Sequence, residues 1–277
     1  MKIAILCVWT GTQPQYLPKV IENHQQFANQ NGFTYIFKHL PTLSDEEATS
    51  SDRISEGIRV AVWNQITEAQ KILNSNNFDY VMKIDSDAIF GNMRFDINSI
   101  LSEKKSFFFT GDISDIFNGG NWIMRNDDFS KFLIEDWLRY SKEKFKLLNT
   151  SHQTADGRLS DQPAMNILLR VGIGSNFEEL NEVEVFNLMN GFYGNHDRRF
   201  RYFHRFLAPT NRINLFLASM LINRRIRRKV SILPQRTLNS YETRVTKDTF
   251  VIHFAGARKH ELASFLSNLE VNFETNS

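Results

Sequence analysis

The stretch Tyr80–Phe90, YVMKIDSDAIF, decides the fold expected for this chain. Its apolar run predicts a buried strand over Phe78–Ile84, and Asp85 and Asp87 follow at the end of that strand. Side chains two residues apart on a strand point to the same face, so continued extension would direct both carboxylates toward one point. Two adjacent anions repel each other, which favours a divalent cation such as Mg²⁺ or Mn²⁺ between them. Asp-x-Asp pairs also arise by chance in a chain of this length, and here it is the position at a strand end that favours a ligand site.

The sequence around this stretch predicts an α/β fold with a mostly parallel central sheet flanked by helices. Lys2–Val8 is a continuous apolar run, typical of a strand covered on both faces. A helix is expected over Tyr16–Asn31, with Gly32 as its stop, and a second strand over Phe33–Phe37. This β-α-β order favours a parallel sheet. The remaining predicted elements are helices over residues 58–73, 96–101, 127–148 and 259–269, a helix that opens at 160–163, and strands over 106–110, 183–186 and 250–254.

Composition sets the broad class of the protein. The chain has 277 residues and a net charge of +2, so we expect a single domain over 1–277 and no general affinity for nucleic acid. The single cysteine, Cys7, lies inside the first predicted strand and is interpreted as a buried apolar filler, consistent with a reducing, cytoplasmic location. The first apolar run is too short for a signal peptide, and no run approaches the roughly 20 residues of a membrane span.

A basic segment interrupts this pattern at about residues 195–229, where we expect an insertion. An apolar stretch over 213–222 lies between clusters of arginines that start at Arg198 and end next to Lys229. One interpretation is a solvated basic face around a buried apolar helix. The other is peripheral docking of residues 198–229 on an anionic membrane surface, near a lipid-linked or surface glycan acceptor.

A histidine near the end of the last predicted strand is the second chemical feature. Alone, His253 would be interpreted as structural. Paired with Asp85 and Asp87 it becomes a third metal ligand, and an imidazole among carboxylates favours Mn²⁺ over Mg²⁺. Three residues of the turn that follows it fit a phosphate: Gly256 would allow close approach of the backbone, and Arg258 or Lys259 would neutralise the charge.

Two short polar motifs have both a structural and a functional interpretation. The sequence Ser160-Asp161-Gln162-Pro163 is most simply a helix cap with an early proline. Asn118-Gly119-Gly120 is most simply a turn. In a glycosyl-transfer site, the polar side chains of either motif could orient a sugar.

Taken in order, these motifs resemble glycosyltransferase family 34, which includes yeast α-mannan and galactomannan enzymes and plant xyloglucan xylosyltransferases. The resemblance spans most of the chain except 195–229. Each motif is weak alone, and their shared order makes the resemblance more specific. The matching pieces are Asp85-Ser86-Asp87-Ala88, Asn118-Gly119-Gly120, residues 122–126, Trp137, Asp161-Gln162, and His253-Phe254-Ala255-Gly256, with residues 26–33 and Trp63 in the amino-terminal half.

This resemblance implies a GT-A fold, a nucleotide-sugar donor with UDP-sugars favoured, Mn²⁺ dependence and retention of anomeric configuration. It implies that Asp85 faces the ribose or sugar of the donor while Asp87 and His253 hold the metal. Two positions depart from the family pattern, because lysines expected there are replaced by Gln65 and by Arg258, the latter followed by Lys259. The family's remaining roles fall on Asn118, Asp161 and Gln162 around the transferred sugar.

The expected reaction moves a hexose or pentose to a glycan or glycolipid acceptor. The sequence contains no clear covalent nucleophile, and Asp161 is the only candidate. We favour a front-face route in which the departing phosphate accepts the proton of the acceptor. Two rival classes stay open. One is a non-catalytic carbohydrate- or membrane-binding module, and the other is a Mg²⁺-dependent phosphohydrolase, which would draw further carboxylates from Asp112 or Asp115.

Overall fold

A computed structural model describes most of the amino-terminal half of the chain and several segments of the rest. The described residues are 1–41, 53–111, 116–141, 160–174, 219–234, 237–240, 245–246, 248–254, 261–262 and 264–266. Among them, no helix is long and apolar enough to cross a bilayer. The predicted strand at 183–186 and most of the expected insertion at 195–229 lie outside this set.

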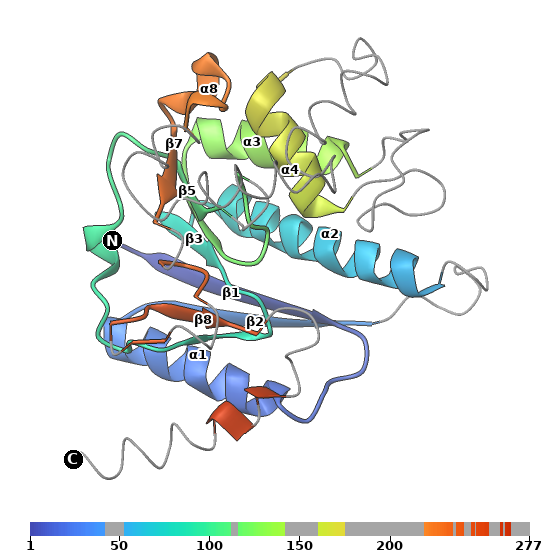
Figure 1. Ribbon diagram of the computed structural model, residues 1–277, viewed down its shortest axis with the longest axis vertical. Coiled ribbons are helices and arrows are strands. Elements are labelled where there is room, and N and C mark those ends of the chain that lie inside the picture. Colours follow the sequence, from blue (N-terminus) through green and yellow to red (C-terminus); the bar gives the residue numbers. More distant parts are fainter. Residues whose placement is uncertain are drawn as a thin grey trace, which may run out of the picture.

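A six-stranded sheet in the order β2-β1-β3-β6-β5-β7 forms the centre of the molecule (Figure 1). β1 (Ile3–Thr10) is parallel to both β2 (Thr34–Leu40) and β3 (Tyr80–Lys83). β6 (Trp122–Arg125) runs antiparallel to β3 and to β5 (Phe107–Thr110). β7 (Val230–Leu233) is parallel to β5, so β6 alone opposes the direction of the other five strands. The expected mostly parallel α/β sheet is confirmed.

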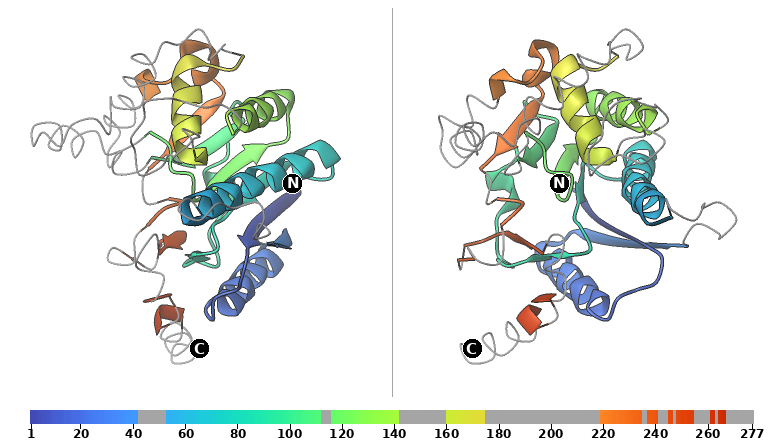
Figure 2. Two further views of the ribbon diagram at one scale, coloured as in Figure 1. Left: turned by 90° about the vertical axis from the view of Figure 1, so that its right-hand side faces the viewer. Right: turned by 45° about the vertical axis from the view of Figure 1, so that its right-hand side comes forward.

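Helices cover both faces of this sheet (Figures 1 and 2). Successive side chains of β1 point to opposite faces of the sheet, which explains the two layers. Leu6 and Val8 lie in one apolar cluster with residues of α2 (Arg53–Ser75), α3 (Asp128–Arg139) and α4 (Asp161–Val171). Ile5 and Cys7 point the other way, into the cluster that includes residues of α1 (Leu17–Asn31). Cys7 is fully buried, as expected, and burial raises the pKa of its thiol to about 12.

Local residues mark several helix ends, although α3 ends at Arg139 rather than at the expected residue 148. Gly32 ends α1 in a left-handed conformation with a φ of 67°, and the carboxylate of Asp127 accepts a hydrogen bond from the backbone N–H of Ser130 at the start of α3. Ser160 precedes α4 as predicted, but its side chain forms no capping hydrogen bond. Two short helices complete the described elements, the 3₁₀ turn η1 (Ile97–Ser99) and α8 (Arg224–Arg227).

A second, two-stranded sheet joins distant parts of the chain. β4 (Ala88–Phe90) pairs antiparallel with β8 (Val251–His253), with Ala88 opposite His253. The backbone N–H of Phe254 donates to the carbonyl of Asp87 over 2.8 Å. Because β4 starts directly after the acidic pair, this pairing carries the histidine to the aspartates.

Candidate metal centre

The acidic pair lies in a turn rather than on an extended strand. β3 ends at Lys83, and the N–H of Ala88 donates to the carbonyl of Asp85 over 3.1 Å, which closes a tight turn over residues 85–88. The expectation of continued extension was therefore wrong, because the chain must reverse here to enter β4. The expected convergence of the two carboxylates is nevertheless found.

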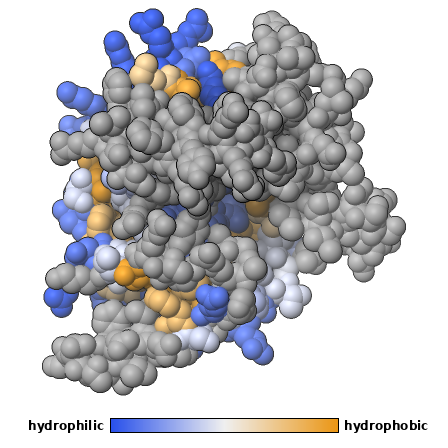
Figure 3. Space-filling view, viewed as in Figure 1, coloured by the Kyte–Doolittle hydropathy of each residue, from blue (hydrophilic) through white to orange (hydrophobic). Residues whose placement is uncertain are grey.

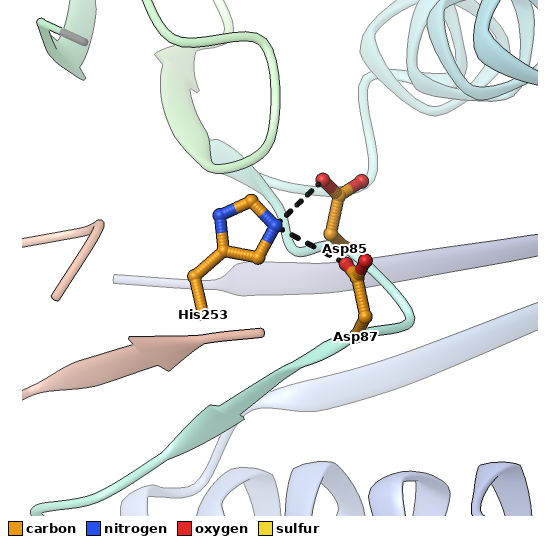
Figure 4. Close-up of side chains that lie close together, drawn as sticks. All are labelled: Asp85, Asp87 and His253. Atoms are coloured by element: carbon orange, nitrogen blue, oxygen red, sulfur yellow. Dashed lines mark hydrogen bonds and ion pairs between the residues drawn. The ribbon is translucent and has the colours of Figure 1, made fainter. Parts of the chain in front are cut away.

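Asp85, Asp87 and His253 together form a candidate metal site (Figure 4). One ligand atom from each lies within 4.8 Å of the others. Nε2 of His253 is 3.2 Å from Oδ1 of Asp87 and 3.5 Å from Oδ2 of Asp85, and the ring nitrogen points toward both carboxylates. Asp87 and His253 are buried. Two carboxylates and one imidazole suit a divalent ion such as Mn²⁺, so the residues present fit the predicted metal.

An asparagine that the sequence reasoning missed holds the histidine in place. Asn239, 1% exposed, has its Oδ1 2.7 Å from Nδ1 of His253. An N–H donated from Nδ1 leaves the Nε2 lone pair facing the aspartates, which is the usual arrangement behind a metal-binding histidine. Burial alone would lower the pKa of His253, but the hydrogen bond that its protonated ring donates to Asp87 and the negative charges of Asp87 and Asp85 outweigh burial and raise that pKa. A proton therefore competes with a metal for this ring.

A buried lysine, also missed, binds the other side of the acidic turn. The Nζ of Lys83 is 2.5 Å from Oδ1 of Asp85, 3.0 Å from the carbonyl of Gly119 and 2.8 Å from the carbonyl of Gly120. The lysine side chain is 2% exposed, so its charge requires these partners. All three ammonium hydrogens are used, and Asp85 is left with Oδ2 directed at His253.

The two glycines that follow Asn118 allow a close approach that no other residue would permit. A Cβ at Gly120 would lie 2.7 Å from Oδ2 of Asp85 and 2.8 Å from Cε1 of His253. A Cβ at Gly119 would instead lie 2.9 Å from Oδ2 of Asp161. Asn118 accepts the N–H of Gly120 through its Oδ1 over 2.9 Å, so its side chain also shapes this turn.

We expect Gly120→Ala to lower Mn²⁺ affinity at least about ten-fold, because the new methyl group displaces two of the three ligands. Gly119→Ala is the matched control, since its methyl group meets Asp161 and should leave Mn²⁺ affinity close to that of the wild type. Calorimetric titration of each metal-free variant with Mn²⁺ measures both. Equal affinities in the two variants would contradict this geometry.

The first turn of α4 lies against the backbone of Gly119. Oε1 of Gln162 accepts the N–H of Gly119 over 3.0 Å, and the indole N–H of Trp137 donates to the carbonyl of Asp161 over 2.9 Å. Asp161 is 8% exposed, and burial raises the pKa of its carboxyl group to about 6, although the nearby Lys83 opposes this shift. The structure thus brings Asn118, Asp161 and Gln162 together beside the acidic turn.

Comparison with known structures identifies the fold of the chain. No protein-family model matches the chain, and no curated protein matches its sequence. The crystal structure of a glycosyltransferase involved in the glycosylation of the major capsid of PBCV-1 is similar to it, with a TM-score of 0.53 and 13% identity over 96% of this chain and 98% of that one. The fold is the GT-A fold. The expectation from the resemblance to family 34 is thereby confirmed for the fold, and assignment to that family stays a prediction.

Two further solved structures are less similar, and the GT-A assignment does not rest on them. An active-site mutant of LgtC matches with a TM-score of 0.41 and 9% identity over 97% of this chain and 95% of that one. The glycosyltransferase GlyE of Streptococcus pneumoniae TIGR4 matches with a TM-score of 0.40 and 13% identity over 99% of this chain and 63% of that one.

Several predicted site residues lie outside the described part of this GT-A fold. They are Gly256, Arg258 and Lys259 after β8, and Asp112 and Asp115 after β5. Their proposed roles stay predictions. Among the residues missed, Lys83 carried a signal, because a charged side chain ends an otherwise apolar strand and needs partners there. Asn239 belongs to no motif that the sequence displays.

Proposed function

We propose that this protein is a metal-dependent glycosyltransferase that uses a nucleotide-sugar donor. One observation carries the proposal: Asp85, Asp87 and His253 bring three oxygen and nitrogen ligand atoms within 4.8 Å of one another at the carboxyl end of β3. Open α/β sheets bind their ligands at that edge. A hard divalent ion held there would supply positive charge for the diphosphate of a donor.

The chain's residues divide into two groups around the bond that breaks. Asp87 and His253 would hold Mn²⁺ or Mg²⁺, which supplies positive charge to the leaving nucleoside diphosphate. The basic residues Arg258 and Lys259, with Gly256 beside them, would meet the same diphosphate. Asp85, whose Oδ2 lies 3.5 Å from Nε2 of His253, would complete the metal site and face the ribose or sugar of the donor.

The other group would surround the sugar that is transferred. Asn118, Asp161 and Gln162 lie together around the backbone of Gly119 and Gly120. We propose a retaining, front-face route in which the departing phosphate accepts the proton of the acceptor hydroxyl. Asp161, whose pKa burial raises to about 6, would be largely ionised at neutral pH and would stabilise positive charge that develops on the sugar ring.

The proposed donor is a UDP-hexose or UDP-pentose, and the proposed acceptor is a glycan or glycolipid. We further propose a cytoplasmic enzyme, peripheral on the inner face of a membrane. The basic insertion would form part of the same single domain.

Release of nucleoside diphosphate from a panel of UDP- and GDP-sugars tests the proposal. We expect slow hydrolysis of one donor with Mn²⁺, and its loss on addition of EDTA and in Asp87→Ala, because the leaving diphosphate then lacks its counter-charge. Failure of every donor to be hydrolysed, and to bind by calorimetry with Mn²⁺ present, would reject the assignment in favour of a binding module. Release of inorganic phosphate from simple phosphate esters would instead indicate a phosphohydrolase.

A further inference from the structure

The segment before and through α8 exposes an apolar pair at its tip. Met220 is 53% exposed and Leu221 42%. Of the five large apolar side chains that the described residues expose, these two alone adjoin in sequence. Neighbouring exposed apolar side chains indicate a contact surface more strongly than scattered ones do.

The structure braces this tip. The guanidinium group of Arg227 donates to the carbonyls of Met220 and Ile222 over 2.7 and 2.8 Å. Asn223 joins the tip to the end of α4, because its backbone N–H donates to the carbonyl of Leu169 and its side chain donates to the carbonyl of Val171, both over 2.8 Å. The apolar pair is therefore presented by a fixed turn.

Four exposed cations follow the apolar pair: Arg224, Arg225, Arg228 and Lys229. Among the described residues, none of these side chains forms an ion pair. The space-filling view shows hydrophilic side chains projecting at the top, where α8 lies, with apolar surface beside them (Figure 3).

The charge is segregated along the whole sequence. No Asp or Glu occurs between Asp197 and Glu242, and this stretch carries 11 of the 33 Lys and Arg residues. The rest of the chain therefore has 22 basic against 31 acidic residues. A strongly basic segment in an otherwise acidic chain fits an extended anionic partner.

We propose that the tip, Met220–Lys229, docks the protein on an anionic lipid bilayer. The apolar pair would enter the boundary between headgroups and acyl chains, and the four cations would face anionic headgroups. A nucleic acid would bind the cations without using the exposed Met220 and Leu221, so the bilayer accounts for both features.

The tip lies one helix away from the candidate metal centre. α4 has 11 residues and so spans about 16 Å, with Asp161 at its first turn and the anchors of Asn223 at its other end. If the proposed function holds, a bilayer at the tip would lie near a lipid-linked acceptor. The docking itself depends only on the tip.

Flotation with vesicles of phosphatidylcholine, with and without phosphatidylserine, tests the docking. We expect the wild type to float with the anionic vesicles only and to be released by salt. Neutralising the four cations (Arg224→Gln, Arg225→Gln, Arg228→Gln and Lys229→Gln) should weaken binding at least about a hundred-fold. Met220→Ser with Leu221→Ser should weaken it about ten-fold. Arg227 is left intact in both variants because it braces the turn.

The matched control neutralises four exposed cations elsewhere, Lys2, Lys38, Lys71 and Arg94, and should float like the wild type. Wild-type binding by the tip-neutralised variant, equal binding to neutral vesicles, or binding of single-stranded DNA with no vesicle binding would each overturn the proposal. Donor hydrolysis in a vesicle-free assay separates the docking proposal from the proposed glycosyltransferase function. This hydrolysis does not depend on docking, so the tip variants should hydrolyse the donor like the wild type.

Discussion

Lys83→Met is expected to lower the free energy of unfolding of the metal-free protein by about 2–4 kcal/mol. The lysine ammonium is buried and donates to one carboxylate and two backbone carbonyls. Methionine preserves much of the side chain's volume but none of its hydrogen bonds, so Oδ1 of Asp85 and the carbonyls of Gly119 and Gly120 would lose their partner. Urea denaturation in the presence of EDTA measures this loss.

Two companion variants make the lysine measurement specific. Lys71→Met removes a lysine whose side chain is 64% exposed and paired with Glu68, and should change stability by less than about 0.5 kcal/mol. Adding Asp85→Asn to Lys83→Met should recover at least about 1 kcal/mol, because the orphaned carboxylate is then neutral. A Lys83→Met protein as stable as the wild type would show that the ammonium does not hold the two loops together.

The second large effect concerns the histidine and the asparagine behind it. His253→Ala removes one of three metal ligands and should lower Mn²⁺ affinity by more than about a hundred-fold. Asn239→Leu leaves the ligand but removes the acceptor of its Nδ1–H, and should cost about 10–100-fold. Asn239→Asp restores an acceptor of the same shape and should return affinity to at least the wild-type value. Calorimetric Mn²⁺ titration of the metal-free variants gives all three.

His39→Ala is the control for these titrations, because His39 is exposed on β2 and, among the described residues, its side chain hydrogen-bonds only to the carbonyl of Gly11. It should bind Mn²⁺ like the wild type. An Asn239→Leu protein with unchanged affinity would mean that the asparagine does not position the ring, whatever the result for His253.

The sequence predicted the fold well because its signals are local. The continuous apolar run of β1 and the glycine stop at residue 32 each act within a few residues. The short helix expected at 96–101 is a single 3₁₀ turn, and the strand expected over 78–84 is shorter at both ends. Several of the 24 phenylalanines form stacked pairs in or against the core, such as Phe27 with Phe90 and Phe95 with Phe250.

The sequence predicted only those site residues whose chemical type and position suggest a ligand by themselves. Asp85, Asp87 and His253 were found because carboxylates and imidazole at strand ends suggest a metal. Asn239 and Asn121 were not, because their role depends on which segments lie side by side. Asn121, fully buried, accepts the N–H of Asp85 and donates to the carbonyl of Leu238. No spacing along the chain reveals such a bridge.

The pairing of β4 with β8 also sets the order in which the protein can become complete during synthesis. The ring of His253 meets Asp87 across 166 positions of sequence. Asp85, Asp87 and Lys83 leave the ribosome early. His253 follows only after all strands of the six-stranded sheet have been translated. A growing chain therefore lacks the third ligand until β8 is translated, and a product that stops short of residue 253 cannot form the complete centre.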